Sequence, residues 1–256
     1  MLLNMAEDKY RRFEREYAVV ATDFYDLAQQ SALAAFVREH SGEGVYFYGG
    51  YDDAERRGIV FIPDYLDICA EDLPDFFREN PKDCPYSVLD VKAGRKDAAL
   101  KHSDYLGSLL ALGIKREKTG DILVHDSGAQ ILVTKEIAPY LAENYTKAGR
   151  IPVSATEISI SDLRATAPNM ERIKTVISSP RLDNAVAAVF SVSRRSAAEA
   201  ISRGMVFVNN MEAKKPDLYL KGGEKLVLRG RGKAIYLGDK GTSRKGKIYA
   251  EFDKYI

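Results

Sequence analysis

The segment SVSRRSAAEAISRGMVFVNN, residues 191–210, places arginines where a predicted helix runs into a predicted strand. Ser193 is a candidate N-cap for this helix, and Ser196 with Glu199 forms an alternative capping box one turn later. Gly204 is a natural residue just beyond the end of the helix. The strand MVFVNN then leads into MEAKKPD through a tight turn, since Asn tolerates positive φ. We therefore expect a small helix and strand that carry an exposed basic surface.

The sequence on either side of this segment extends the same pattern. RLDNAVAAVF (181–190) predicts a preceding short helix, and GGEKLVLRGRGK predicts a turn, a strand and a basic loop. Two small helices cannot bury so many guanidinium groups, and exposed salt bridges contribute little to stability. Arginine is also suited to bidentate contact with phosphate. The candidate RNA-binding residues of this module are Arg181, Ser193, Arg194, Arg195, Arg203, Lys214, Lys215, Arg229 and Arg231.

The charge of the chain is distributed unevenly. The whole chain holds 38 Lys and Arg against 37 Asp and Glu, a formal net charge of +1. Residues 181–256 hold 16 cationic and 8 acidic residues, whereas residues 1–180 hold 22 and 29. This asymmetry favours a polyanion-binding module attached to another part. The alternative is a solvated basic face, or a patch that docks onto the acidic part.

The composition, 45% hydrophobic and 29% charged over 256 residues, is that of an ordinary soluble protein with one to three domains. No apolar run approaches the roughly 18 residues of a membrane span, and the N-terminus has no block of signal-peptide length. Cys69 and Cys84 are too few and too far apart for a disulfide framework or a metal site. We expect a cytoplasmic monomer that does not bind membranes.

Residues 1–80 predict a small N-terminal α+β domain. An aromatic stripe at alternating three- and four-residue spacing predicts a helix within residues 7–38. VYFYGG (45–50) and GIVFIP (58–63) predict a hairpin, and LDICAEDLPDFF predicts a helix. NPKDCP (80–85) is a plausible boundary, because it is rich in turn-forming residues.

Residues 81–170 predict the order βαββαβ, which is the split βαβ arrangement of ferredoxin-like and RNA-recognition (RRM) folds. The aromatic signature with which RRM domains stack bases is absent, so base stacking on this sheet is not expected. Lys115, Arg116 and Lys118 form a short basic loop after the first helix. This loop is either an auxiliary RNA contact or a solvated helix end. The expected fold class is therefore α+β, in three small units.

The C-terminal module resembles the RNA-binding domain named after small-subunit ribosomal protein S-four. The matching pieces are RLD, the SR pair at the second helix, I-x-x-G-x-V-x-V-N, the KKP turn and the strand GGEKLVL. The departures are Arg195, where serine is common, and Asn210, where glycine is common. The resemblance implies an S-four domain over residues 181–240. Residues 171–180 would join it to the central domain, and residues 241–256 would form a basic extension.

HSDYLGSLLALGIKREKTGDILV in the middle of the chain resembles the central region of YlmH-type proteins, which carry an N-terminal unit, an RRM-like unit and a terminal S-four domain. The resemblance extends to nearly the whole chain. It implies binding to structured ribosomal RNA on the large subunit. It also implies tRNA binding, in a role with stalled peptidyl-tRNA in ribosome-associated quality control.

The sequence offers no catalytic, cofactor or metal motif. Asp183 of RLD begins a helix, where a capping or ion-pair role is expected rather than that of a synthase's catalytic aspartate. GTSRKGKI (241–248) has Ile248 where a phosphate-binding loop needs Ser or Thr. The three histidines lack metal spacing. We expect a protein without catalysis or cofactor. The alternatives are an RNA-modifying enzyme, either a pseudouridine synthase or a methyltransferase, and an interaction protein of cell division.

Overall fold

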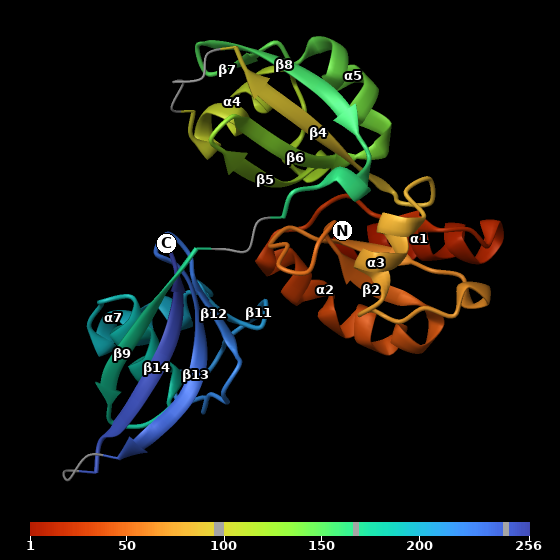
Figure 1. Ribbon diagram of the computed structural model, residues 1–256. Coiled ribbons are helices and arrows are strands. Elements are labelled where there is room, and N and C mark those ends of the chain that lie inside the picture. Colours follow the sequence, from red (N-terminus) through yellow and green to blue (C-terminus); the bar gives the residue numbers. More distant parts are fainter. Residues whose placement is uncertain (95–99, 166–168, 243–245) are drawn as a thin grey trace. The chain divides into compact units, whose positions relative to one another are not determined.

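The structure, a computed structural model, describes residues 1–94, 100–165, 169–242 and 246–256. It is a mixed α+β fold with three antiparallel sheets (Figure 1). The chain divides into two compact units, Met1–Ala165 and Thr166–Ile256. The predicted α+β class is confirmed at this level.

The first unit begins with α1 (Leu2–Glu16), β1 (Val20–Ala21) and α2 (Leu27–Glu39). β2 (Val45–Tyr48) and β3 (Gly58–Phe61) form the predicted antiparallel hairpin, and β1 pairs with β3 at the other edge. The short 3₁₀ helices η1 (Ser41–Glu43) and η2 (Asp64–Leu66) and the helix α3 (Leu73–Glu79) complete this part.

The helix expected within residues 7–38 is two helices. Tyr17 adopts a left-handed conformation with φ 48° and ends α1, and its amide donates to the carbonyl of Phe13. α2 has its own start, because Asp26 and Gln29 form a capping box. The aromatic residues therefore keep their regular spacing across a break between two helices. The break arises because α1 ends at Tyr17 and α2 begins after Asp26.

The rest of the first unit is β4 (Tyr86–Ala93), α4 (His102–Ala111), η3 (Arg116–Lys118), β5 (Thr119–His125), β6 (Gly128–Thr134), η4 (Lys135–Ile137), α5 (Ala138–Asn144), β7 (Lys147–Ala148), β8 (Ile151–Ile158) and η5 (Ile160–Asp162). The strands form an antiparallel sheet in the order β5-β6-β4-β8-β7. The order of the main elements is the predicted βαββαβ, with β7 as a short addition.

Both faces of this sheet are buried. Leu89 and Val91 of β4 face a core that includes residues of α4 and α5. Val88, which precedes Leu89 and so faces the other side of the sheet, packs in a second core with Phe24 and Val60 from the first 80 residues. Residues 1–80 and the βαββαβ segment thus share a hydrophobic core within one compact unit. The division expected near residue 80 stays a prediction.

The second unit consists of β9 (Met170–Ile177), α6 (Leu182–Val189), α7 (Arg194–Ser202), β10 (Val206–Val208), β11 (Met211–Glu212), β12 (Lys225–Leu228), β13 (Gly232–Thr242) and β14 (Ile248–Tyr255). Its strands form one sheet in the order β11-β10-β12-β13-β14-β9. α6 and α7 pack together, and their apolar residues share one core with Val206, Leu226 and Phe252 of the sheet.

The segment expected to join two domains at 171–180 is instead largely a strand of this sheet. β9 pairs with β14 along its whole length, from Met170 opposite Tyr255 to Ile177 opposite Ile248 (Figure 1). β14 likewise replaces most of the expected basic extension, of which residues 243–245 lie outside the described residues. The physical reason is burial: Ile177 and Phe252 belong to the core beneath the helices.

Candidate RNA-binding surface

The start of α7 is fixed by Ser193. Its hydroxyl oxygen accepts a hydrogen bond from the amide of Ser196 at 3.0 Å, so the predicted N-cap is confirmed. The alternative start one turn later is wrong, because Ser196 lies inside the helix. Arg194 and Arg195 therefore occupy the first turn of α7, where backbone N–H groups lack helical partners.

Asp183 holds two of the candidate arginines. Its side chain is only 5% exposed, and Oδ2 accepts from Nη2 of Arg181 at 3.0 Å and from Nε of Arg194 at 3.0 Å. Oδ1 accepts from Nε of Arg181 at 3.2 Å and from the amide of Asn184 at 2.9 Å. The ion-pair role predicted for Asp183 is confirmed. The carboxylate joins the first turns of α6 and α7.

The electrostatics of Asp183 follow from these contacts. Burial raises the pKa of its carboxyl, but the hydrogen bonds from Arg181 and Arg194 outweigh burial, so its pKa lies below the usual value. The carboxylate therefore stays ionised at neutral pH. Arg194 remains 56% exposed, and only its Nε is hydrogen-bonded among the described residues. Its two terminal nitrogens have no hydrogen-bond partner among the described residues.

A basic turn is attached to the same place. The amide of Asp183 donates to the carbonyl of Pro216 at 3.0 Å, directly after Lys214 and Lys215. Both lysines are exposed, and neither has an ion-pair partner among the described residues. We call Arg181, Asp183, Arg194, Lys214 and Lys215 the arginine cluster. The structure brings these residues together from three segments.

Arg195 and Arg203 lie on α7 beside the cluster. The side chain of Arg195 is 90% exposed, and its Nε donates to Oε1 of Glu199 at 3.2 Å. Such an exposed pair is worth little, so it leaves Arg195 available to a stronger anion. Arg203 is exposed at the C-terminal end of the helix. Both stay predicted RNA contacts.

Arg229 lies away from the cluster. Its guanidinium carbon is 5.0 Å from the centre of the Phe207 ring. Val206 and Val208 face the core with the helices, so Phe207 between them points to the opposite face of the sheet. Arg229 therefore contacts the face that α6 and α7 do not cover. Arg231 is exposed in the following turn.

The basic loop of the first unit is largely engaged in that unit's own structure. Nη1 of Arg116 donates to the carbonyls of Thr119 at 2.7 Å and Gly120 at 3.1 Å, and burial with the nearby charge of Arg56 lowers the pKa of Arg116 to about 10. Lys118 donates to Asp23 at 2.8 Å and to Glu136. Lys115 is exposed.

One candidate contact gave no signal in the sequence analysis. Tyr219 is 64% exposed and forms a backbone bridge with Arg181, so an aromatic ring stands beside the arginine cluster. Exposed tyrosine next to cationic residues suits stacking on a nucleic-acid base. Its position two residues after the KKPD turn (214–217) is the pattern that could have identified it.

The described residues hold no group of three or more His, Cys, Asp or Glu side chains that could hold a metal ion. In the same part of the chain, no helix is long and apolar enough to cross a membrane.

A comparison with protein-family models identifies the class of the central domain. Residues 80–162 match the family model described as "Putative RNA-binding domain in YlmH", and this match spans β4 to η5. The central part of the chain therefore matches a putative RNA-binding domain.

The whole chain is similar to one curated protein, Ribosome-associated protein quality control protein P2 of Bacillus subtilis (strain 168). The two are 29% identical over 252 residues, which cover 98% of this chain and 93% of the relative. A solved structure of Cell division protein ylmH from Streptococcus pneumoniae is 26% identical, with a TM-score of 0.44, over 61% of this chain and 88% of that chain. The chain is thus a homologue of the Bacillus protein and carries the putative RNA-binding domain of YlmH at residues 80–162.

Proposed function

We propose that this protein binds structured ribosomal RNA of the large subunit through the arginine cluster. The observation that carries the proposal is the buried carboxylate of Asp183. Its Oδ2 lies 3.0 Å from a guanidinium nitrogen of Arg181 and 3.0 Å from one of Arg194, so it holds both arginines at one place. A role in stability alone does not account for Arg194, because its side chain remains 56% exposed beside the ion pair. Phosphate is the anion that such a pair of oriented guanidinium groups recognises.

The start of α7 adds to this surface. The first N–H groups of a helix carry partial positive charge and point outward, so they favour an anion at that position. Ser193 accepts the amide of Ser196. The amides of Arg194 and Arg195 remain without helical partners. RNA phosphates bound there would contact the backbone amides and the arginine side chains together.

The fold supports a finer assignment. We propose that the βαββαβ segment is an RRM-like domain and that α6, α7 and the strands after them form an S-four domain. β9 and β14 then extend that domain beyond residues 181–240. The N-terminal 80 residues are proposed as a separate α+β domain by descent, although they share a core with the central sheet.

The biological step proposed here is ribosome-associated quality control in the cytoplasm, in which a monomer contacts the large subunit and peptidyl-tRNA without catalysis. The similarity to the Bacillus quality-control protein over 98% of the chain supports this step. The competing proposal, an RNA-modifying enzyme, predicts altered bases after incubation of the protein with ribosomal RNA and S-adenosylmethionine. The proposed function predicts none.

The test is sedimentation of the full chain with purified large ribosomal subunits. The variant R194E/R195E should lose most of its binding, because two charges at the phosphate surface are reversed. The matched control is R11E/R15E, which reverses two charges on the exposed face of α1 in the other unit. The control should bind nearly as the wild type does.

Two results would contradict the proposal. One is a folded R194E/R195E variant that sediments with subunits as well as the wild type. The other is an equal loss in both double variants, which would show that overall charge, and not the arginine cluster, governs binding. Circular dichroism of each variant controls for folding.

A further inference from the structure

A groove of about 510 Å³ lies between α1 and α2 in the first unit. The two helices share one hydrophobic core with β2 and β3. On the outer side of the helix pair, Ala32 and Ala35 are exposed and line the groove, and their small side chains leave its space open. The lining on α1 extends from Leu3 to Glu14, so the groove follows this helix for about 16 Å. This length suits a segment of polypeptide better than one small molecule.

Three aromatic rings form the floor of the groove. The centre of the His40 ring lies 4.8 Å from that of Tyr10 and 4.5 Å from that of Phe36. Phe36 is buried, whereas Tyr10 and His40 are partly exposed. Leu3 is 47% exposed and adds an apolar side chain at the N-terminal end of α1. The floor can therefore receive apolar groups, and its rings attract a cation placed over their faces.

Carboxylates stand on both helices beside these rings. Glu7 and Glu14 line the groove from α1, and Glu39 lines it from α2. Among the described residues, neither Glu14 nor Glu39 has a hydrogen bond or an ion pair, and both are exposed. In the same part of the chain, Arg11 is the one Lys or Arg of the lining, and its charge is shared between Glu7 at 3.9 Å and Asp8 at 3.7 Å. The groove thus has an excess of negative charge.

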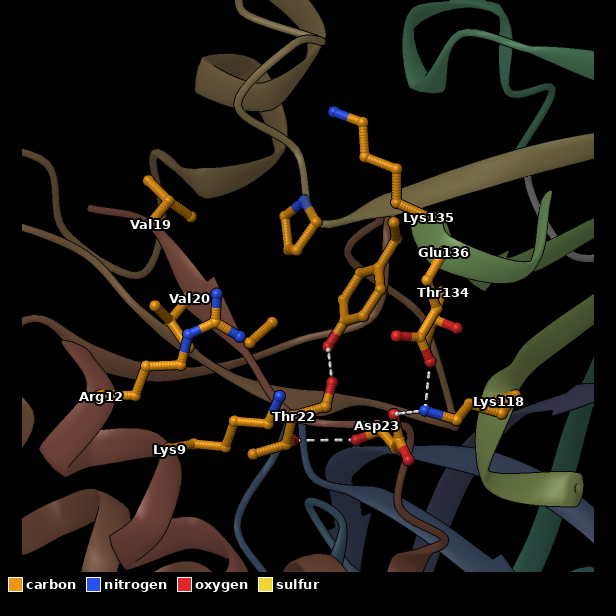
Figure 2. A pocket seen from close by; sticks show the side chains of 13 residues that line it. Lys9, Arg12, Val19, Val20, Thr22, Asp23, Lys118, Thr134, Lys135 and Glu136 are labelled. Atoms are coloured by element: carbon orange, nitrogen blue, oxygen red, sulfur yellow. Dashed lines mark hydrogen bonds and ion pairs between the residues drawn. The ribbon is translucent and has the colours of Figure 1, made fainter. Parts of the chain in front are cut away.

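The surroundings of the groove preserve this negative charge. The hydroxyl of Tyr10 donates to Glu43, and this hydrogen bond, with burial and the charges of Glu43 and Glu14, raises the pKa of Tyr10 to about 12. The other cations of α1 do not line the groove. Lys9 and Arg12 are on the opposite side of the helix, where they extend into a separate cavity beside β1 (Figure 2).

We propose that this groove docks an amphipathic helix of a protein partner that carries lysines or arginines beside its apolar residues. A third helix lying between α1 and α2 would place apolar side chains on Leu3 and the two alanines. Its cations would meet the aromatic floor and the unpaired carboxylates, which are complementary in charge. The same carboxylates repel RNA, so this partner differs in chemistry from the ligand of the arginine cluster. The groove lies in the other unit, and the proposal does not rest on the proposed function.

The test is fluorescence anisotropy of the full chain with a labelled amphipathic helical peptide composed of Leu, Ala and Lys. E14K/E39K should weaken binding of this peptide by roughly tenfold or more, because both unpaired carboxylates of the groove are reversed in charge. The matched control is D126K/E143K, which makes the same change of charge at two exposed carboxylates of the first unit outside the groove. The control should bind nearly as the wild type does.

A second pair of variants tests the shape of the groove without changing its charge. A35W should block the peptide, because the indole fills the space beside Phe36, whereas A35S should bind as the wild type does. Ala35 is exposed, so neither change disturbs the core, and circular dichroism checks the fold.

Three results would overturn the proposal. The first is a wild type that does not prefer the lysine peptide to the same peptide with glutamate in place of lysine. The second is a folded E14K/E39K variant that binds as tightly as D126K/E143K. The third is unchanged binding in A35W, which would show that overall charge holds the peptide and that the groove does not.

Discussion

The carboxylate of Asp183 lies 3.0 Å from Nε of Arg194, so a buried residue of α6 orients an exposed residue of α7. The same carboxylate binds Arg181, at the N-cap of α6. Two cationic side chains that would otherwise sample many rotamers are thereby held at one surface. Because immobilised side chains lose less entropy when a ligand binds, this arrangement favours a phosphate ligand before it arrives.

Replacing Asp183 with Asn should affect both stability and RNA binding. The isosteric amide keeps the shape but loses two charge-assisted hydrogen bonds, so the free energy of unfolding of the second unit should fall by about 1 to 2 kcal/mol. RNA affinity should fall less than in R194E, because Arg194 keeps its charge and loses only its orientation. Urea unfolding and filter binding measure the two effects. Unchanged RNA affinity in a folded D183N variant would show that the orientation does not matter.

The lowered pKa of Asp183 predicts that stability depends on pH in the acid range. The pKa of Asp183 is lower in the folded chain than in the unfolded chain, so the folded state resists protonation. Its contribution to stability is fully present above the unfolded value of about 3.9 and is lost as the pH falls through the lower folded value. Thermal unfolding between neutral pH and acid should therefore show a steeper loss for wild type than for D183N. Parallel curves in this range would contradict the assignment.

Reversing the charge of Arg194 should change the salt dependence of RNA binding. Each phosphate contact that is lost should flatten the slope of log affinity against log salt by roughly 0.7 to 0.9. R194E should show this change, and R195E should show it only if Arg195 leaves Glu199 for the RNA. A salt titration of both single variants measures it. A slope equal to that of wild type in folded R194E would falsify the phosphate contact.

The pairing of β9 with β14 predicts which fragments fold. Residues 166–256 expressed alone should give a cooperative thermal transition, because they contain the whole sheet and its core. Residues 181–240 should not, because they lack Ile177 and Phe252 and leave the core open on one side. Circular dichroism melting distinguishes the two. An equally cooperative transition in the shorter fragment would mean that the two strands are dispensable.

Lys115 and Lys118 of the basic loop should behave differently when each is replaced by alanine. Lys118→Ala should lower the stability of the first unit by about 1 kcal/mol, because two carboxylates lose their shared partner. Lys115→Ala should leave stability unchanged and weaken subunit binding if the loop is an auxiliary contact. Thermal melting and sedimentation with subunits report the two effects separately. A loss of binding in neither variant would assign the loop to the protein's own structure.

Much of the fold could be predicted because local signals and tertiary packing agree. Ser193 and Gly204 mark both ends of α7, and Asn209 with Asn210 takes the expected positive φ in the turn between β10 and β11. The helix within residues 7–38 was predicted as continuous because the left-handed conformation of Tyr17 carries no glycine or proline signal. Periodicity alone does not reveal such a break.

The site was less predictable, since charge in a sequence does not show which cations are already paired. Lys118 sits between Asp23 and Glu136, residues far from it in sequence. Arg229 turns to the other face of the sheet because Phe207 offers its ring there. The role of Asp183 could be predicted as an ion pair, but its link to Arg194 depends on how α6 and α7 pack.

β9 and β14 are neighbours in space but far apart along the chain, and this distance has a consequence for synthesis. When β9 emerges from the ribosome, its future partner has not yet been made, so Ile173 and Ile177 lie at an open edge. Long-range strand pairing of this kind is slow, and unpaired apolar edges associate with other chains. Chains released before β14 is complete should therefore aggregate or be degraded, and the second unit can close only after its last strand is made.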